Sequence, residues 1–257
     1  MARNRVLRWV PVLALLAAGF AGTGAAGRAP YETHSIGAKT IYQTPYYVFD
    51  GRAPGPTVLI EAGIHGNELA GTAALDDLLT KIRVHSGRVI VLPRMNKPAD
   101  ERHVRYINLD LNRSFVDRAR ETPYEYPLAR AIFDLAKAEH ASYVITLHES
   151  AELHDAADPS RLGQSICYGT SPKPAVLEPW LARLNATIAD ARERFVASYF
   201  PIPTSSTEVM VAQLALKGGF CVETWSGLPW RERVHLQWSA VDTFLTTLGI
   251  AHDYAKS

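Results

Sequence analysis

Short, uninterrupted apolar runs alternate along this chain with longer segments of helical periodicity, and this alternation constrains the fold more than any other feature of the sequence. A short apolar run without polar interruptions is typical of a strand that is buried on both faces, as in a sheet covered by helices. Strands that alternate with helices predict an α/β fold, a three-layer sandwich in which a mixed, largely parallel sheet carries helices on both faces. The predicted strands are residues 46–50, 57–62, 89–92, 143–147 and 220–224, and the predicted helices are residues 69–82, 128–136, 177–196 and 234–248.

A turn separates the first two predicted strands. Asp50-Gly51 closes residues 46–50, and two prolines follow before residues 57–62, so we expect the two strands to pair. The chain has 257 residues, 47% of them hydrophobic, and contains no fixed-period repeat or long linker. That is enough apolar material for one substantial core, and we expect a single catalytic domain over residues 27–257.

The N-terminus has the pattern of a secretory signal. Three arginines precede an apolar stretch over residues 9–20, and the small residues 21–26 follow it. The apolar stretch is shorter than the roughly 18 to 20 residues that a membrane span requires, which favours a cleaved signal peptide, residues 1–26, over a retained anchor. We therefore expect a secreted or periplasmic protein, with cleavage near Ala26 and no stable membrane span afterwards.

The charge balance restricts the partners. A formal net charge of +1 without any basic run provides no electrostatic footprint for nucleic acid or for an anionic membrane surface. The expected partner is a small molecule or a peptide. Two cysteines, Cys167 and Cys221, are compatible with one disulfide in an oxidising compartment, and their pairing is a hypothesis.

A Gly-Ile-His-Gly-Asn-Glu motif, residues 63–68, directly follows the predicted strand 57–62. His65 and Glu68 are three residues apart, so both can face one point if a helical turn begins there. Imidazole and carboxylate are ordinary zinc ligands, and a catalytic zinc has three protein ligands and one open position. The glycines on either side of His65 allow the tight backbone path that such a loop needs. The motif therefore predicts two of three metal ligands.

His148 is the candidate for the third ligand, because it ends the apolar strand 143–147 and would otherwise be a costly buried polar group. The alternative is a core histidine that bonds to a neighbouring carbonyl. His154, Glu149 and Glu152 are nearby alternatives as ligands, but they fall in a polar loop and are interpreted as the rim of the site.

Glu223 lies in the otherwise apolar strand 220–224. Burial would raise the pKa of a carboxylate there, which suits a general base that takes a proton from water and later donates it to a leaving amine. The alternative is a structural carboxylate paired with an arginine.

Arg105, Asn112 and Arg113 lie close together in the segment 104–115. Their forked donors suit a substrate carboxylate and a developing oxyanion. Apolar residues alternate around them, which predicts that these three side chains are buried rather than solvated.

Together these motifs resemble the zinc carboxypeptidase superfamily and, within it, the succinylglutamate desuccinylase and aspartoacylase branch. Residues 63–68 are similar to the first zinc motif of that branch, and the segment from Arg105 to Arg113 is similar to its substrate-binding segment. His148 and Glu223 correspond in position to the third ligand and the catalytic glutamate. The resemblance spans residues 58–225.

The resemblance implies a role for each residue and a reaction. His65, Glu68 and His148 would bind one Zn²⁺ ion, and Glu223 would activate the water. Arg105 would polarise the scissile carbonyl, while Asn112 and Arg113 would hold a substrate carboxylate. The implied reaction is hydrolysis of an amide bond next to a carboxylate, in a peptide or in an N-acyl-amino acid.

The sequence departs from the cytosolic members of that branch, which resemble two-domain proteins with a β-rich C-terminal domain. Here 34 residues follow Glu223 and predict one helix. With the secretory pattern, this favours exogenous or cell-wall peptides, and a narrower hypothesis is a peptidoglycan-peptide amidase or carboxypeptidase in which Glu149 and Glu152 receive an amine. A non-catalytic protein that binds a metal or a peptide is the alternative from another class.

Overall fold

A computed structural model describes residues 30–116 and 122–255 of the chain. The predicted signal peptide, residues 1–26, lies outside the described residues. Within the part that is described, no helix combines the length and the apolar character needed to cross a membrane.

The strands are β1 (Glu32–Ile36), β2 (Thr44–Asp50), β3 (Ala53–Ala62), β4 (Ile82–Val84), β5 (Ser86–Leu92), β6 (Tyr143–Ser150), β7 (Ser165–Tyr168), β8 (Val196–Tyr199), β9 (Gly218–Trp225) and β10 (His252–Tyr254). The α-helices are α1 (Leu69–Lys81), α2 (Lys97–Arg102), α3 (Glu125–Ala138), α4 (Leu177–Ala186), α5 (Ser206–Leu214) and α6 (Trp230–Thr247), and the short 3₁₀ helices are η1 (Leu111–Arg113) and η2 (Ala191–Glu193).

An eight-stranded mixed sheet forms the centre of the fold, in the order β1-β2-β5-β3-β6-β9-β7-β8. Its middle strands β5, β3, β6 and β9 are parallel, whereas β1, β2 and the β7–β9 pair are antiparallel. A separate two-stranded sheet joins β10 to β4. The predicted mixed, largely parallel sheet is confirmed.

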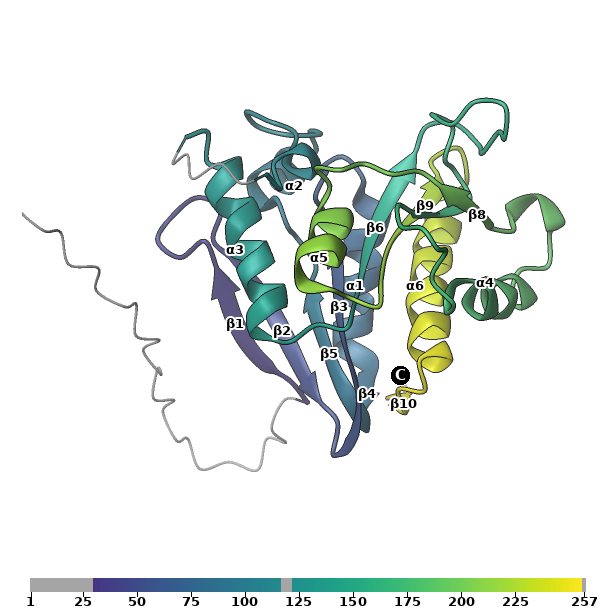
Figure 1. Ribbon diagram of the computed structural model, residues 1–257, viewed down its shortest axis with the longest axis horizontal. Coiled ribbons are helices and arrows are strands. Elements are labelled where there is room, and N and C mark those ends of the chain that lie inside the picture. The colour runs from purple at the N-terminus through teal and green to yellow at the C-terminus, as the bar shows by residue number, and fades with distance from the viewer. Residues whose placement is uncertain (1–29, 117–121, 256–257) are drawn as a thin grey trace, which may run out of the picture.

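Helices cover both faces of the sheet, as predicted (Figure 1). On one face, Leu75 of α1, Trp180 of α4 and Phe244 of α6 belong to a single buried cluster with alternate residues of the central strands. On the other face, Ile132 of α3 and Met210 of α5 belong to a second cluster. Because both faces are buried, the central strands need apolar side chains at consecutive positions, which is the pattern that the sequence showed.

Two expectations about these elements are wrong. Strand β2 does not pair with β3, because β5 lies between them and pairs with both. The prolines after Asp50 suggested a hairpin, but the partner of β2 is a strand that returns later in the chain. The predicted helix 177–196 ends at Ala186 in α4, and residues 187–195 pass through η2 before β8 begins at Val196.

The two cysteines lie opposite each other in the antiparallel pairing of β7 with β9. Both are nevertheless free thiols, so the structure does not contain the hypothetical disulfide.

Candidate active site

The loop that carries the first two ligand candidates begins where β3 ends. Gly63 has a φ of +67°, a left-handed conformation that favours glycine, and it turns the chain out of the sheet. A Cβ atom on Gly66 would lie 2.0 Å from the carbonyl carbon of Ala99, so the loop packs directly on the backbone of α2. This close packing places His65 over the sheet and Glu68 immediately before the first residue of α1.

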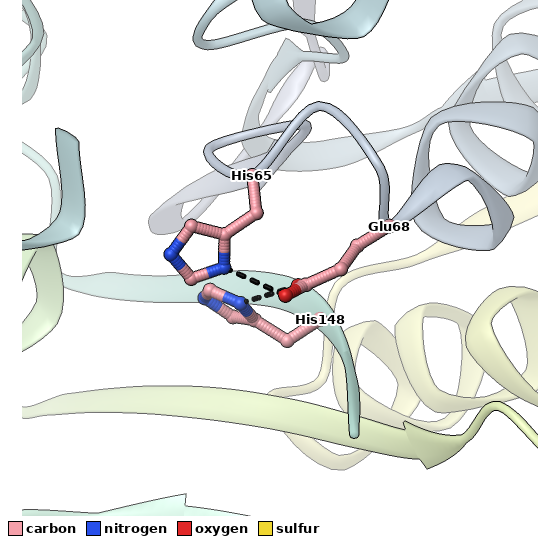
Figure 2. Close-up of side chains that lie close together, drawn as sticks. All are labelled: His65, Glu68 and His148. Atoms are coloured by element: carbon pink, nitrogen blue, oxygen red, sulfur yellow. Dashed lines mark hydrogen bonds and ion pairs between the residues drawn. The ribbon is translucent and has the colours of Figure 1, made fainter. Parts of the chain in front are cut away.

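The side chains of His65, Glu68 and His148 meet at one point (Figure 2). Nδ1 of His65 is 2.7 Å from Oε1 of Glu68, and Nδ1 of His148 is 2.9 Å from Oε2 of the same carboxylate. All three side chains are buried, and one ligand atom from each lies within 4.8 Å of the others. The structure therefore brings together the three residues that the sequence singled out as ligands.

This arrangement fits a divalent cation. Burial opposes ionisation of Glu68, but the two imidazoles hold the pKa of its carboxyl far below the usual range. Burial likewise opposes the charged form of His65, yet Glu68 and Asp110 raise its pKa to about 9. The imidazole nitrogens and the carboxylate oxygens are all electron-pair donors, so without a metal protons must lie between them. A divalent cation can replace these protons. Two imidazole nitrogens and one carboxylate form a common donor set for catalytic zinc.

A further carboxylate, which sequence reasoning did not single out, supports His65. Oδ1 of Asp110 lies 3.1 Å from Nε2 of His65, on the side of the ring away from Glu68. The same oxygen accepts a hydrogen bond from the amide of Asn112 at the start of η1. A carboxylate behind a ligating histidine fixes the tautomer and orientation of the ring. The available signal was an aspartate two residues before Asn112, within the segment 104–115.

Helix α6 supports His148 from the opposite face of the sheet. Nε2 of Gln237 donates to the carbonyl oxygen of His148 at 2.6 Å. One turn earlier, Arg233 forms an ion pair with the buried carboxylate of Glu149, whose other oxygen accepts from the amide of Ala70 at 3.0 Å. Glu149 therefore links α6, α1 and the strand that carries His148.

The interpretation of Glu149 as an exposed rim residue is therefore wrong. Its side chain is 3% exposed and its carboxylate already has two partners, so it is not available to receive a substrate amine. Strand β6 continues to Ser150, three residues beyond the predicted end. Glu149 therefore belongs to the strand and not to a loop, and its side chain points into the protein. Glu152 does lie on the surface, at 68% exposure.

Glu223 lies directly opposite His148 in the parallel pairing of β6 with β9. Residues paired in this way project to the same face, so the carboxylate is beside the three ligand candidates. Burial raises the pKa of Glu223 to about 6; His148 opposes this shift, and Glu68 adds to it. Among the described residues, none forms a hydrogen bond with its carboxylate, which leaves both oxygens available to water or substrate.

The three predicted clamp residues differ in their surroundings. Arg105 is 44% exposed and forms ion pairs of 3.2 Å with both Glu68 and Asp110. Asn112 is buried, and its Oδ1 accepts from the amide of Ser206 at 3.2 Å. Arg113 is exposed and donates to the carbonyl oxygen of Asn112. The expectation that all three are buried is therefore wrong for the arginines, because their segment forms loop and 3₁₀ turns in which alternation does not indicate burial.

A known protein family matches most of this chain. The chain matches the family described as the succinylglutamate desuccinylase/aspartoacylase catalytic domain over residues 54–236. It is 29% identical over 208 residues to a succinylglutamate desuccinylase from Yersinia pseudotuberculosis, an alignment that covers 75% of this chain and 58% of the relative. A shorter match, 44% identical over 69 residues, relates 25% of this chain to 20% of the N-alpha-acetyl-L-2,4-diaminobutyric acid deacetylase of Halomonas elongata.

The fold is similar to that of Csd4 from Helicobacter pylori, described as a D,L-carboxypeptidase and solved in a form bound to mDAP. The TM-score is 0.71 with 23% sequence identity, and the match covers 78% of this chain and 52% of Csd4. The chain thus spans 58% or less of the length of each of these three relatives.

Proposed function

This chain belongs to the succinylglutamate desuccinylase/aspartoacylase catalytic-domain family, and from that premise we propose that it is a zinc-dependent hydrolase. Its reaction would be cleavage of an amide bond next to a carboxylate, in a peptide or an N-acyl-amino acid. The observation that carries the proposal is the position of Glu223, opposite His148 and beside the buried cluster of His65, Glu68 and His148.

His65, Glu68 and His148 would hold the zinc ion. When bound, zinc supplies Lewis acidity to a substrate carbonyl and makes a nearby water molecule more acidic. Asp110 keeps the ring of His65 in place through Nε2, which leaves Nδ1 directed at the cluster. Gln237 fixes the backbone of His148 at its carbonyl oxygen.

Glu223 would act as general base and then as general acid. Its carboxylate takes a proton from the attacking water and later donates that proton to the leaving amine. Both transfers need a group whose pKa is close to neutrality, and burial moves Glu223 in that direction.

Arg105 would polarise the scissile carbonyl and stabilise the oxyanion, since its guanidinium lies at the edge of the cluster against Glu68. Asn112 and Arg113 would hold the substrate carboxylate. The turn of η1 carries both residues, and the bond from Ser206 fixes the amide oxygen of Asn112.

A direct test combines metal analysis with an activity assay. The purified protein is expected to contain one equivalent of zinc and to hydrolyse at least one member of a panel of N-acyl-amino acids and peptides with free C-termini. Glu223→Gln is expected to retain the zinc while turnover falls at least about a hundredfold, as is typical for loss of a general base. Undiminished turnover in that variant would refute the role of Glu223.

The same panel separates the two alternatives. Muropeptides included in it would test the peptidoglycan hypothesis, which has lost one of its two rim carboxylates because Glu149 is paired with Arg233. Zinc binding without turnover on any member would favour the non-catalytic binding protein.

The proposal includes a location outside the cytoplasm, supported by the arginines, apolar stretch and small residues at positions 3–26. N-terminal sequencing of the protein recovered from the medium or periplasm should give a first residue near position 27. Recovery of the full-length chain from the cytoplasm alone would contradict this location.

A further inference from the structure

A pocket of about 330 Å³ lies between the residues that follow β7, the loop that precedes α5 and α5 itself. Apolar side chains, among them Pro201, Pro203 and Val209, form much of its wall. Among the described residues that line it, Glu208 is the only charged one. A hydrocarbon chain with a charged end fits this combination better than a purely apolar or purely polar group.

The two oxygens of Glu208 have different surroundings. Oε2 accepts from the hydroxyl of Ser205 at 2.5 Å and from the amide of Ile202 at 2.6 Å, so it belongs to the cap of α5. Oε1 has no hydrogen-bond partner among residues 30–116 and 122–255. Capping of α5 therefore accounts for the position of Oε2, whereas Oε1 remains available to a ligand.

The side chain of Glu208 packs closely against the backbone of Gly169. A Cβ atom on Gly169 would lie 2.1 Å from Oε1 of Glu208, so a larger residue at position 169 would require this side chain to shift. Burial raises the pKa of Glu208, and the two hydrogen bonds and Arg113 oppose that shift. Among the described residues, Arg113 forms no ion pair with Glu208, and its guanidinium donates to the carbonyl oxygen of Asn112.

The first turn of α5, which precedes Glu208, packs directly against residues of the candidate active site. Ser206, two residues before Glu208, donates its amide to the side chain of Asn112. The hydroxyl of Thr207 lies 3.7 Å from Sγ of Cys221, which precedes Glu223 by two residues on the same face of β9. Arg113, one of the two residues that would hold the substrate carboxylate, also lies near enough to Glu208 to lower the pKa of its carboxyl, so a substrate held there could extend a side chain toward Glu208.

We propose that this pocket is the specificity subsite of the enzyme and that Glu208 binds the ammonium group of an amine-bearing substrate residue. The inference rests on the proposed function, because it assigns a substrate class to the same site. The methylene groups of such a side chain would pack against the prolines and Val209, while Oε1 accepts a charge-assisted hydrogen bond from the ammonium.

Matched substrates that differ only in the terminal ammonium provide the test. One pair is Nα-acetyl-lysine, which keeps a free side-chain ammonium, with Nα-acetyl-norleucine. The other is a peptide that ends in lysine with the same peptide ending in norleucine. The zinc-loaded protein is expected to show a kcat/KM at least about tenfold higher for the lysine member. Glu208→Gln is expected to lower the kcat/KM for the lysine substrate by about the same factor and to change the kcat/KM for the norleucine substrate by less than about twofold.

Glutamine retains a carbonyl oxygen for the cap of α5, so the variant removes the charge with little change in shape. A general folding defect would lower the kcat/KM for both substrates of a pair by the same factor. An equal loss of this kind would overturn the inference. Glu152→Gln is the matched control, because it makes the same chemical change at an exposed glutamate of the rim. If that control abolished the preference and Glu208→Gln did not, the ammonium would bind at the rim and not in this pocket.

Failure of the proposed function can be distinguished from failure of the subsite. If the zinc-loaded protein hydrolyses no member of either pair, the proposed function fails, and calorimetry with N-acetyl-lysine and N-acetyl-norleucine then tests the pocket without turnover. Stronger binding of the lysine compound that Glu208→Gln abolishes would support the subsite. Equal binding of the two compounds would overturn it.

Discussion

The carboxylate of Asp110 and the imidazole of His65 form a contact of 3.1 Å behind the ligand cluster, between Oδ1 and Nε2. The opposite nitrogen of the same ring faces Glu68 at 2.7 Å. The ring is therefore held from both sides, and its orientation is set before any metal binds. This preorganisation leads to a first prediction.

Asp110→Asn should weaken zinc binding by about 10-fold to 100-fold, because a neutral amide supports the ligating ring less than a carboxylate does. Competition with a chromophoric chelator measures the affinity. Asp134→Asn, which changes an exposed partner of Arg130 on α3, is the matched control and should bind zinc normally. An unchanged affinity in Asp110→Asn would mean that Asp110 supports only the turn of η1.

Zinc binding should release protons at neutral pH. In the metal-free protein the pKa of His65 is raised to about 9, so this imidazole is protonated at pH 7 and must lose its proton to become a ligand. The apparent affinity should therefore rise about tenfold per pH unit up to about pH 9, and should fall as the pH is lowered. Calorimetry in buffers of different ionisation enthalpy counts the released protons; a heat of binding independent of the buffer would contradict the prediction.

The ion pair between Arg233 and Glu149 should contribute to stability as well as to the position of His148. Arg233→Met leaves a buried carboxylate without its cation, and the expected loss is about 3 kcal/mol in the free energy of unfolding. The double variant Glu149→Gln with Arg233→Met should recover part of that loss, because no unpaired charge remains. Urea unfolding of the metal-free proteins measures both values, and a double variant no more stable than the single one would argue against this explanation.

Glu61 should make the metal-free protein less stable as the pH rises. Its carboxyl is fully buried on β3, and burial raises its pKa from 4.5 to about 8, although the hydrogen bond from Thr146 opposes this shift. Between these two values the folded protein binds one more proton than the unfolded chain, so raising the pH favours unfolding. Stability should fall by at most about 1.4 kcal/mol per pH unit over this window, with little further change above about pH 8.

Glu61→Gln removes the titrating group and should flatten this dependence, and its gain in stability over the wild-type protein should be largest at pH 8 and above. Urea midpoints at intervals between pH 5 and pH 9 provide the measurement. Parallel pH profiles for the two proteins would show that Glu61 is not responsible.

Cys167 and Cys221 should be unreactive thiols in the folded protein. Burial raises the pKa of both, so the thiolate that reacts with electrophiles is scarce. Titration with a disulfide reagent should detect two thiols after unfolding and almost none before it. If protein isolated under oxidising conditions shows no thiol even when unfolded, these two cross-strand neighbours have formed a disulfide.

The sequence by itself determined the class of fold and singled out the three residues that we propose as metal ligands. Short apolar runs need burial on both faces, and a sheet between two layers of helices provides it, so the central strands could be recognised without tertiary information. His65, Glu68 and His148 could be found for a related reason. The first two lie in the loop that follows a buried strand, and His148 follows the apolar run of another, where a polar side chain needs a specific partner. Glu223 was recognisable in the same way.

Only the tertiary structure decided which segments meet. The pairing of β2 with β5 rather than β3 depends on a strand that arrives later in the chain, and no local turn signal specifies it. Likewise, Glu149 and Glu152 are both acidic residues near the end of β6, but Arg233 from α6 approaches only Glu149. Contacts between distant residues depend on packing over the whole core, whereas strand burial and ligand chemistry are properties of short segments. For this reason the candidate ligands could be singled out from the sequence, while their supporting contacts and the pocket beside Glu208 required the folded chain.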